Sequence, residues 1–281
     1  MGSNSMNFEL VEHYFEGKSI HQKSEDVLFW NKHFFAVFDG ATSKTTSATK
    51  VTPGREIVEI AASTLSKLPA DIKFAAAVKK MNESIRSIQA TNVHSRSDAI
   101  IEKPSATLAI ISSLRNELWL LGDCQALVDG QEHKYPKLID TTNATFRAAV
   151  NQLALQRGKS IEWLRNNDIG RDAILPVLKE QTVFQNVEKK SMFAYGALDG
   201  SAEALSYLKI IDISAAEEVV IASDGYTKLF SNLKDSEEHL ESLLKRDPMM
   251  IYDFVQTKGM SKGNISFDDR AYLKVRRVTP E

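Results

Sequence analysis

Acidic residues stand where apolar runs begin or end at three places in this sequence. The run Phe34–Phe38 ends in Asp39-Gly40, and the run Val219–Ala222 ends in Ser223, Asp224 and a glycine. A third run begins just after Asp268. A buried strand that ends at Asp-Gly presents a carboxylate at the edge of a sheet, and the glycine allows the backbone to turn sharply there. Carboxylates that converge repel each other unless a cation joins them, and all-oxygen ligands favour Mg²⁺ or Mn²⁺. The pattern therefore predicts a divalent metal site.

The composition is that of an ordinary globular protein. Of the 281 residues, 43% are hydrophobic and 26% are charged, and the formal net charge is −2. This charge argues against a nucleic-acid partner. The single cysteine, Cys124, excludes an internal disulfide and fits a reducing compartment. No apolar stretch approaches the roughly 20 residues that span a bilayer, and no signal peptide is visible. We expect a cytoplasmic protein without membrane contact, and we expect Met1–Ser5 to be a cloning remnant.

The apolar periodicity changes several times along the chain. Helical spacing predicts helices over 55–68 and 72–88, over parts of 145–180, and near 236–258. Alternation predicts strands at Phe8–Tyr14, Asp26–Trp30, Phe34–Phe38, Thr107–Ser112, Glu117–Leu121, Gln125–Val128, Leu205–Ile213, Glu218–Ala222 and 270–278. Turns are predicted at Leu114-Arg115-Asn116 and at Asp129-Gly130.

This order of elements favours an α+β protein with mainly antiparallel sheets, because the strands follow one another as hairpins and the helices are inserted as pairs. No linker or repeat divides the sequence, so residues 6–281 are read as one domain. Neither a G-x-G-x-x-G nor a G-x-x-x-x-G-K-[ST] motif is present, which disfavours a nucleotide-binding doubly wound fold.

Five short motifs, in this order, resemble the metal-dependent PP2C-type (PPM) protein serine/threonine phosphatases. The likeness runs from about Ser24 to Val275. The motifs are Glu25-Asp26; Val37-Phe38-Asp39-Gly40; Ser105-Ala106-Thr107 with Leu121-Gly122-Asp123-Cys124; Ile221-Ala222-Ser223-Asp224-Gly225; and Ser266-Phe267-Asp268-Asp269. Each motif is weak alone, but five in the right order at strand ends form a strong signal for the fold and the metal site.

The resemblance implies a central antiparallel β-sandwich flanked by helices on both faces, a four-layer αββα arrangement. It also implies two divalent metal ions, Mn²⁺ or Mg²⁺, at one end of the sandwich. Asp39 would bridge both ions, the Gly40 carbonyl would bind one of them, and Asp224 and Asp268 would hold the other. Glu25 and Asp26 would act through metal-bound waters. Asp123 would order water or hold a weaker third ion.

The implied reaction is hydrolysis of a phosphate monoester by a hydroxide shared between the two ions. Two metals about 3.5–4 Å apart can lower the pKa of a shared water to near neutrality. No protein nucleophile is required, so Cys124 is expected to be a bystander.

Three positions depart from the family pattern. The family usually follows its first Asp-Gly with His-Gly-Gly, whereas Ala41 follows Gly40 here, which leaves Lys44 or a water as the candidate proton donor. The arginine that often contacts the phosphate is replaced by His21, which becomes the candidate phosphate contact. Asp269 stands where many members have Asn. Residues 136–200 carry little family signal and are expected to form a divergent helical or flap region.

The leading hypothesis is a monomeric phosphatase that acts on phosphoserine or phosphothreonine of a protein, in a pathway with a cognate Ser/Thr kinase. Two alternatives stay open. One is a PP2C-like binding or regulatory module with weak or no turnover, which the missing histidine and arginine favour. The other is a small-molecule phosphohydrolase, since nothing in the sequence identifies a protein substrate.

Overall fold

A computed structural model of the chain describes residues 7–20, 23–41, 52–92, 104–188 and 191–278. Met1–Ser5, the expected cloning remnant, lie outside the described residues. No helix in these ranges combines the length and the apolar character needed to cross a lipid bilayer.

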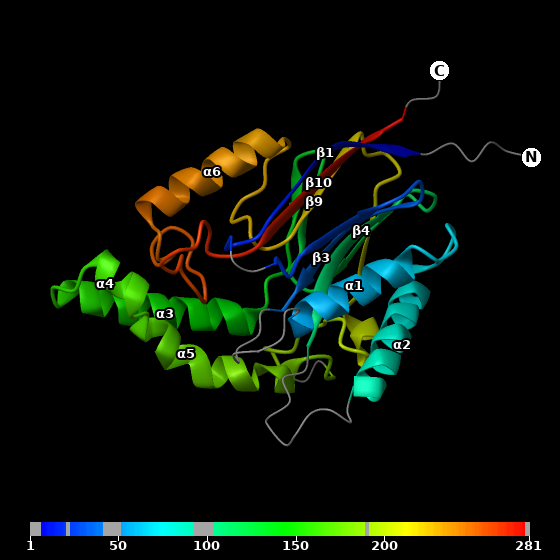
Figure 1. Cartoon of the computed structure of the whole chain (residues 1–281). Coiled ribbons are helices and arrows are strands. Elements are labelled where there is room, and N and C mark those ends of the chain that lie inside the picture. The colour runs from blue at the N-terminus through cyan, green and yellow to red at the C-terminus, as the bar shows by residue number, and fades with distance from the viewer. Residues whose placement is uncertain (1–6, 21–22, 42–51, 93–103, 189–190, 279–281) are drawn as a thin grey trace, which may run out of the picture.

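Two five-stranded antiparallel sheets form the centre of the molecule (Figure 1). The first sheet has the order β1-β10-β9-β6-β7. Its strands are β1 Phe8–Glu16, β10 Arg270–Arg277, β9 Glu218–Ala222, β6 Gln125–Val128 and β7 Gln131–His133. The second sheet has the order β2-β3-β4-β5-β8. Its strands are β2 Val27–Trp30, β3 Phe34–Gly40, β4 Ala106–Ser112, β5 Glu117–Leu121 and β8 Lys209–Asp212. The α+β class and the antiparallel sheets predicted from the sequence are confirmed.

The predicted turns also form. Residues 113–116 connect β4 to β5 in an antiparallel hairpin. Asp129 and Gly130 connect β6 to β7, and both have positive φ angles, 47° and 82°. Such angles suit a two-residue turn whose twist matches that of the flanking strands.

Strand β3 is buried on both faces, which explains its continuous apolar run. Phe35 and Val37 point between the sheets and pack with residues of β4, β5, β9 and β10. Phe34, Ala36 and Phe38 point to the other face and pack against helices. Because side chains alternate along a strand, Asp39 has the same parity as Val37 and lies at the end of the inter-sheet space.

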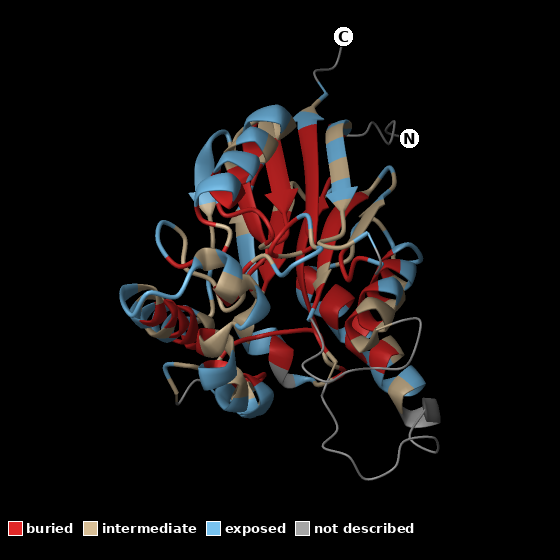
Figure 2. Cartoon of the chain, turned by 60° about the vertical axis from the view of Figure 1, so that its left-hand side comes forward, coloured by how far each residue is buried: buried red, intermediate tan, exposed pale blue. Residues whose placement is uncertain are grey.

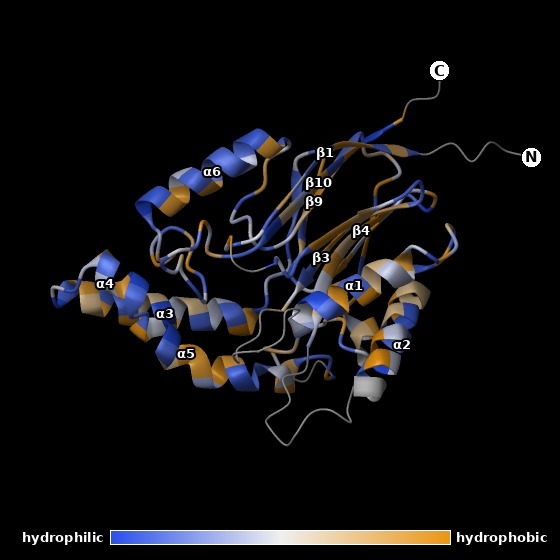
Figure 3. Ribbon diagram, viewed as in Figure 1, coloured by the Kyte–Doolittle hydropathy of each residue, from blue (hydrophilic) through white to orange (hydrophobic). Residues whose placement is uncertain are grey.

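Helices cover the outer faces of both sheets, so the layers run helix, sheet, sheet, helix (Figure 1). Helices α1 (Pro53–Leu65) and α2 (Phe74–Asn92) bury Ile57, Val78 and Met81 against the β3 sheet. Helix α6 (Leu233–Arg246) buries Leu240 and Leu243 against the β9 sheet. Buried residues dominate β3, β4, β5, β9 and β10 (Figure 2). The helices carry both hydrophilic and hydrophobic residues, as expected for amphipathic helices (Figure 3).

Three further helices lie together at one end of the sandwich, apart from the covering layers (Figure 1). They are α3 (Leu138–Gln156), α4 (Ile161–Asn166) and α5 (Ile169–Glu180). They share a separate hydrophobic cluster with Met249 and Ile251 of a distant loop. These helices coincide with the region that was expected to diverge from the family.

Two predicted elements differ from the structure. The strand predicted from Leu205 begins only at Lys209, because Glu203–Tyr207 form a 3₁₀ helix. The helix predicted to reach residue 258 ends at Arg246, where Asp247 and then Pro248 follow. The Asp247 carboxylate accepts hydrogen bonds from the backbone N–H groups of Ile251 (2.9 Å) and Tyr252 (2.8 Å), which stabilises a loop in place of further helical turns.

Candidate metal centre

Antiparallel pairing brings the acidic positions of the sequence to one end of the sandwich. In an antiparallel pair, the last residues of one strand lie beside the first residues of the next. Asp39 at the end of β3 pairs with Thr107 at the start of β4. Ala222 at the end of β9 pairs with Tyr272 near the start of β10. The end of β3 therefore lies beside the start of β4, and the end of β9 lies beside the start of β10. The carboxylates of Asp39 and Asp224, at the ends of β3 and β9, lie close together.

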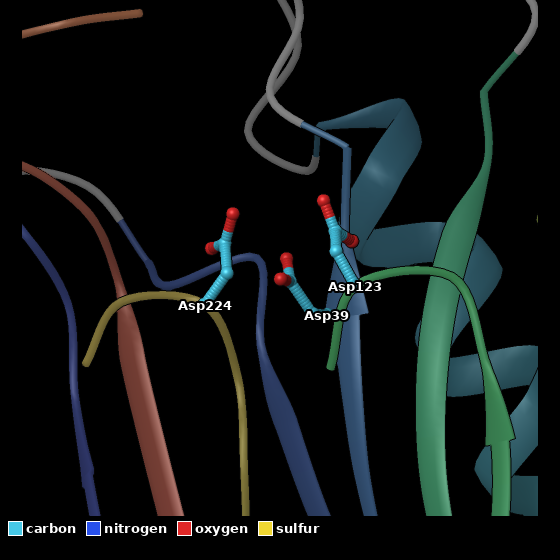
Figure 4. A group of neighbouring side chains, drawn as sticks. All are labelled: Asp39, Asp123 and Asp224. Carbon is cyan, nitrogen blue, oxygen red and sulfur yellow. The ribbon is translucent and has the colours of Figure 1, made fainter. Parts of the chain in front are cut away.

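Three aspartates form the centre of the site. One carboxylate oxygen from each of Asp39, Asp123 and Asp224 lies within 4.8 Å of the other two. Asp39 belongs to one sheet, Asp224 follows β9 of the other, and Asp123 lies between β5 and β6, where the chain crosses between the sheets. The three side chains point toward one another above the strand ends (Figure 4). We call these residues the aspartate trio.

The aspartate trio carries unbalanced negative charge. Burial, followed by repulsion from Asp26 and Asp224, raises the pKa of Asp39 well above its ordinary value. Burial, followed by repulsion from Asp123 and Asp268, raises the pKa of Asp224 to about 7. A cation among these oxygens would relieve the repulsion.

The glycines of the Asp-Gly motifs allow close packing. Asp224 and Gly225 form a turn, as predicted, whereas Gly40 still belongs to β3. Neither Gly40 nor Gly225 has a positive φ angle. A Cβ atom on Gly40 would lie 2.8 Å from the Glu25 carbonyl oxygen. A Cβ atom on Gly225 would lie 1.9 Å from the Asp269 carbonyl oxygen. Each glycine lets a neighbouring segment approach closely enough to place its acidic residues beside the trio.

Glu25 and Asp26 lie deeper than the trio, and each is only 1% exposed. Neither Glu25 carboxylate oxygen accepts a hydrogen bond from the described residues, and the same holds for Oδ2 of Asp26. Burial and the charge of Asp269 raise the pKa of Asp26 well above its ordinary value. Buried carboxylate oxygens without donors are costly unless a cation or ordered water satisfies them. The donor set, which is all oxygen, fits a hard divalent ion.

Asp269 is a structural clamp. Its Oδ1 accepts a hydrogen bond from the Lys18 backbone N–H (2.8 Å), and its Oδ2 accepts one from the Glu25 backbone N–H (2.9 Å). These bonds fasten the segment between β1 and β2 to the start of β10.

Asp268 has a different environment from the trio, although it lines the same cleft. Its Oδ1 lies 2.6 Å from Nζ of Lys258 and 3.5 Å from Nζ of Lys18. Burial by itself would raise the pKa of Asp268, but the two lysines outweigh burial and lower it. Asp268 is outside the group of three described acidic residues whose oxygens lie within 4.8 Å of one another.

A cleft with a volume of about 440 Å³ opens above these carboxylates. Basic residues also line the cleft: Lys134, Lys137, Arg171, Lys179 and Lys258. Lys137 forms an ion pair with Asp123 at 3.0 Å. Arg171 donates a hydrogen bond to the Thr257 carbonyl oxygen (2.8 Å), and no carboxylate of the described residues forms an ion pair with its guanidinium. Burial, followed by repulsion from Arg147, lowers the pKa of Arg171 and outweighs the attraction of Asp168, Asp268 and Asp140.

A buried arginine positions two of these basic residues. The Arg147 side chain is fully buried and lies 2.6 Å from Oδ2 of Asp168, the N-cap residue of α5. It also donates to the carbonyl oxygen of Gln256 (2.9 Å). Arg147 thereby holds both the start of α5, which carries Arg171, and the loop that ends in Lys258.

The remaining predicted site residues divide into two groups. His21 and Lys44, the candidate phosphate contact and proton donor, lie outside the described residues. The Cys124 thiol is buried, and burial followed by the nearby Asp39 charge raises its pKa well above the ordinary value. A thiol that stays protonated is a poor nucleophile, which agrees with the prediction that Cys124 is a bystander.

Sequence reasoning missed the lysines and the arginine that face the acidic residues. Lys18, Lys137, Arg171 and Lys258 come from four separate segments, and none stands in a motif. The folding of α3, α5 and the 247–258 loop over the strand ends brings Lys137, Arg171 and Lys258 to the cleft. Lys18 approaches Asp268 from the segment between β1 and β2.

A sequence profile described as protein phosphatase 2C matches residues 22–248. The chain therefore belongs to the protein phosphatase 2C family. A search of curated protein sequences finds no match.

The structure of this chain is similar to solved structures of serine/threonine phosphatases. The catalytic domain of PstP, solved with two manganese ions, is 16% identical, with a TM-score of 0.50 over 98% of this chain and 100% of that one. Stp1 from Staphylococcus aureus is 13% identical, with a TM-score of 0.49 over 98% and 96% of the two chains. The phosphatase PstP/Ppp from Mycobacterium tuberculosis is 14% identical, with a TM-score of 0.48 over 97% and 99%. At these identities the likeness concerns the fold alone.

Proposed function

We propose that this protein is a divalent-metal-dependent phosphatase that hydrolyses phosphoserine or phosphothreonine in a protein substrate. The observation that carries the proposal is the convergence of Asp39, Asp123 and Asp224 within 4.8 Å in a cleft that basic residues also line. Membership of the protein phosphatase 2C family supports it. The acidic residues fit a metal ion, and the basic residues fit the phosphate of a substrate.

The acidic and the basic residues of the cleft have different roles in this proposal. The aspartate trio would hold a divalent ion, with the Gly40 carbonyl as a further predicted ligand. When bound, Mn²⁺ or Mg²⁺ supplies Lewis-acid activation of the phosphoryl group and of water. Buried Glu25 and Asp26 add acceptors for ordered water behind the trio. The resemblance implies two ions, whereas the lysines paired with Asp268 favour one.

Phosphate capture is assigned to Arg171, because this chain has His21 where the family pattern often has an arginine. Its guanidinium lines the cleft and uses one of its donors on the Thr257 carbonyl oxygen. The other donors are suited to a bidentate contact with phosphate oxygens. His21 stays a second candidate from the sequence.

The test is hydrolysis of p-nitrophenyl phosphate and of a phosphothreonine peptide with Mn²⁺, with Mg²⁺ and with EDTA. We expect activity with either ion, none with EDTA, and none in Asp224→Asn. Arg171→Ala is expected to raise KM about 10-fold or more and Arg171→Lys to restore part of it, since a hydrogen bond to a charged group contributes about 1.5–3 kcal/mol. Activity that survives EDTA and Asp224→Asn would refute the proposal.

A second candidate function is a binding or regulatory module that keeps the fold and turns over slowly. The ion pair between Lys258 and Asp268 favours it, because a cation other than a metal neutralises a residue expected to be a metal ligand. Mn²⁺ binding without hydrolysis of either substrate would identify this case. A small-molecule phosphate ester that is cleaved much faster than the peptide would identify the third alternative. The cytoplasmic location, the monomeric state and the kinase partner stay predictions from the sequence.

A further inference from the structure

Two lysines divide the acidic centre into two parts with different charge. We call Glu25, Asp268 and Asp269 the lysine-paired corner. Nζ of Lys18 lies 3.7 Å from Glu25, 3.5 Å from Asp268 and 3.4 Å from Asp269. Nζ of Lys258 lies 2.6 Å from Asp268. Three carboxylates thus share two ammonium groups.

The other part is the aspartate trio with Asp26 behind it. Of the described ammonium and guanidinium groups, only Lys137 forms an ion pair there, with Asp123 at 3.0 Å. The demand for an external cation is therefore concentrated on the trio.

Both lysines are held at the backbone close to their partners. The Lys18 N–H donates to Asp269 (2.8 Å), and the Lys18 carbonyl oxygen accepts from Ile265 N–H (3.0 Å). Its side chain is only 12% exposed, so the ammonium group has few alternatives to the carboxylates around it.

The backbone around Lys258 is equally restrained. Arg171 donates to Thr257, the preceding residue, at 2.8 Å. Gly259, the following residue, packs so closely that a Cβ atom would lie 2.8 Å from the Met249 carbonyl oxygen. The ion pair between Lys258 and Asp268 is thus part of a packed loop, unlike a pair between two long surface side chains.

We propose that Lys258 and Lys18 take the place of a metal ion at Asp268, so that this chain binds a single divalent ion at the aspartate trio. An ammonium group 2.6 Å from the Asp268 oxygen would repel a second divalent ion on the same carboxylate. In contrast to the expectation from the family, Asp268 then acts as the counter-ion of two lysines. The inference rests on the proposed function only in taking the trio to bind a divalent ion.

The test counts ions. Equilibrium dialysis against Mn²⁺ followed by elemental analysis is expected to give one ion per chain in the wild type. Lys18→Met with Lys258→Met removes both charges while keeping side-chain length, and we expect it to bind two ions. Lys234→Met, at an exposed helical position, is the matched control and is expected to bind one. Circular dichroism checks the folding of each variant.

Affinities give a second readout that does not need the double variant to fold. Asp268→Asn is expected to change the Kd for Mn²⁺ less than about 3-fold. Asp224→Asn is expected to weaken it roughly 100-fold or more, since outer-shell partners alone cost 10–100-fold. Two Mn²⁺ ions in the wild type, equal weakening by both substitutions, or a folded double variant that binds one ion would each overturn the inference.

Hydrolysis assays separate this inference from the proposed function. One ion per chain with no phosphatase activity would refute the function and leave the inference standing. Two ions per chain with phosphatase activity would support the proposed function and refute the inference.

Discussion

Replacing Asp39 by asparagine is expected to stabilise the metal-free protein and to abolish its response to divalent ions. The substitution keeps the shape of the side chain and removes one charge from the aspartate trio. Asp39 interacts with both other members, whose oxygens lie within 4.8 Å. The prediction follows from the repulsion that raises the pKa of Asp39.

The distances set the size of the effect. Two unit charges about 5 Å apart repel by about 3 kcal/mol at an effective dielectric constant of about 20, so two partners give about 6–7 kcal/mol. Protonation limits this repulsion, because holding a proton on an aspartate at pH 7.5 costs about 5 kcal/mol. The Lys137 ammonium group, 3.0 Å from Asp123, and the open cleft reduce the value further. We therefore expect a gain of about 2–4 kcal/mol in the free energy of unfolding.

The assay is thermal unfolding at pH 7.5 with EDTA and with Mn²⁺. At about 2 °C per kcal/mol for a chain of this size, Asp39→Asn with EDTA is expected to melt about 4–8 °C above the wild type. Mn²⁺ at about 100 times its Kd is expected to stabilise the wild type by about 2.7 kcal/mol and the variant not at all.

Asp71→Asn is the matched control, because Asp71 is exposed in the connection between α1 and α2. It removes the same charge far from the trio, and we expect no change in either condition. A metal-free Asp39→Asn protein that melts at or below the wild-type temperature, or that keeps the wild-type Mn²⁺ shift, would refute the electrostatic reasoning.

Three further predictions concern pH, the buried arginine and a close-packed glycine. The pKa of Asp224 is raised to about 7, so the folded metal-free protein holds a proton that the unfolded chain has released. Its stability is therefore expected to fall from about pH 4 to pH 7 and then level off. Urea unfolding with EDTA at pH 5 to 8 checks this, and stability that rises over this range contradicts it. Arg147→Met leaves the Asp168 carboxylate without its buried partner and is expected to lower the free energy of unfolding by about 3–5 kcal/mol. Hydrogen exchange is expected to become faster in α5 and the 247–258 loop than in the sheets. Unchanged exchange in these two segments would count against a positioning role. Gly225→Ala places a Cβ atom against the Asp269 backbone and is expected to weaken Mn²⁺ binding. Gly130→Ala, where nothing lies within 4 Å of the new Cβ atom, is expected to cost about 1–2 kcal/mol of stability without affecting Mn²⁺ binding. Equal Mn²⁺ affinity in the two variants would show that the close approach at Gly225 is not needed.

Much of the sandwich could be predicted because its pattern is local. The apolar run of β3 indicates a strand that is buried on both faces. The alternation in β1 indicates which of its two faces packs against the core. The hairpin turns between β4 and β5 and between β6 and β7 followed from short turn sequences. The errors occurred where local signals were overridden, as at Arg246, where Asp247 hydrogen-bonds to the backbone beyond it and ends the helix.

The candidate site was predictable only on its acidic side. Asp39 and Asp224 stand at strand ends, and antiparallel pairing converts that position in sequence into proximity in space. The close-packing role of Gly40 and Gly225 was not predictable, because it depends on segments that approach from elsewhere in the chain.

The sequence by itself determined the α+β class, the parity that directs Asp39 between the sheets, and the set of carboxylates that meet at one edge. These features depend on side-chain alternation and on strand order, which a single chain records directly. Only the tertiary structure decided which carboxylates keep their charge for a metal ion. Lys137, Arg171 and Lys258 reach the cleft through α3, α5 and the 247–258 loop, and Lys18 reaches Asp268 from the segment between β1 and β2. The distances from the three lysines to Asp123 and Asp268 depend on long-range packing. Charge compensation falls steeply with distance, so no spacing in the sequence could reveal it.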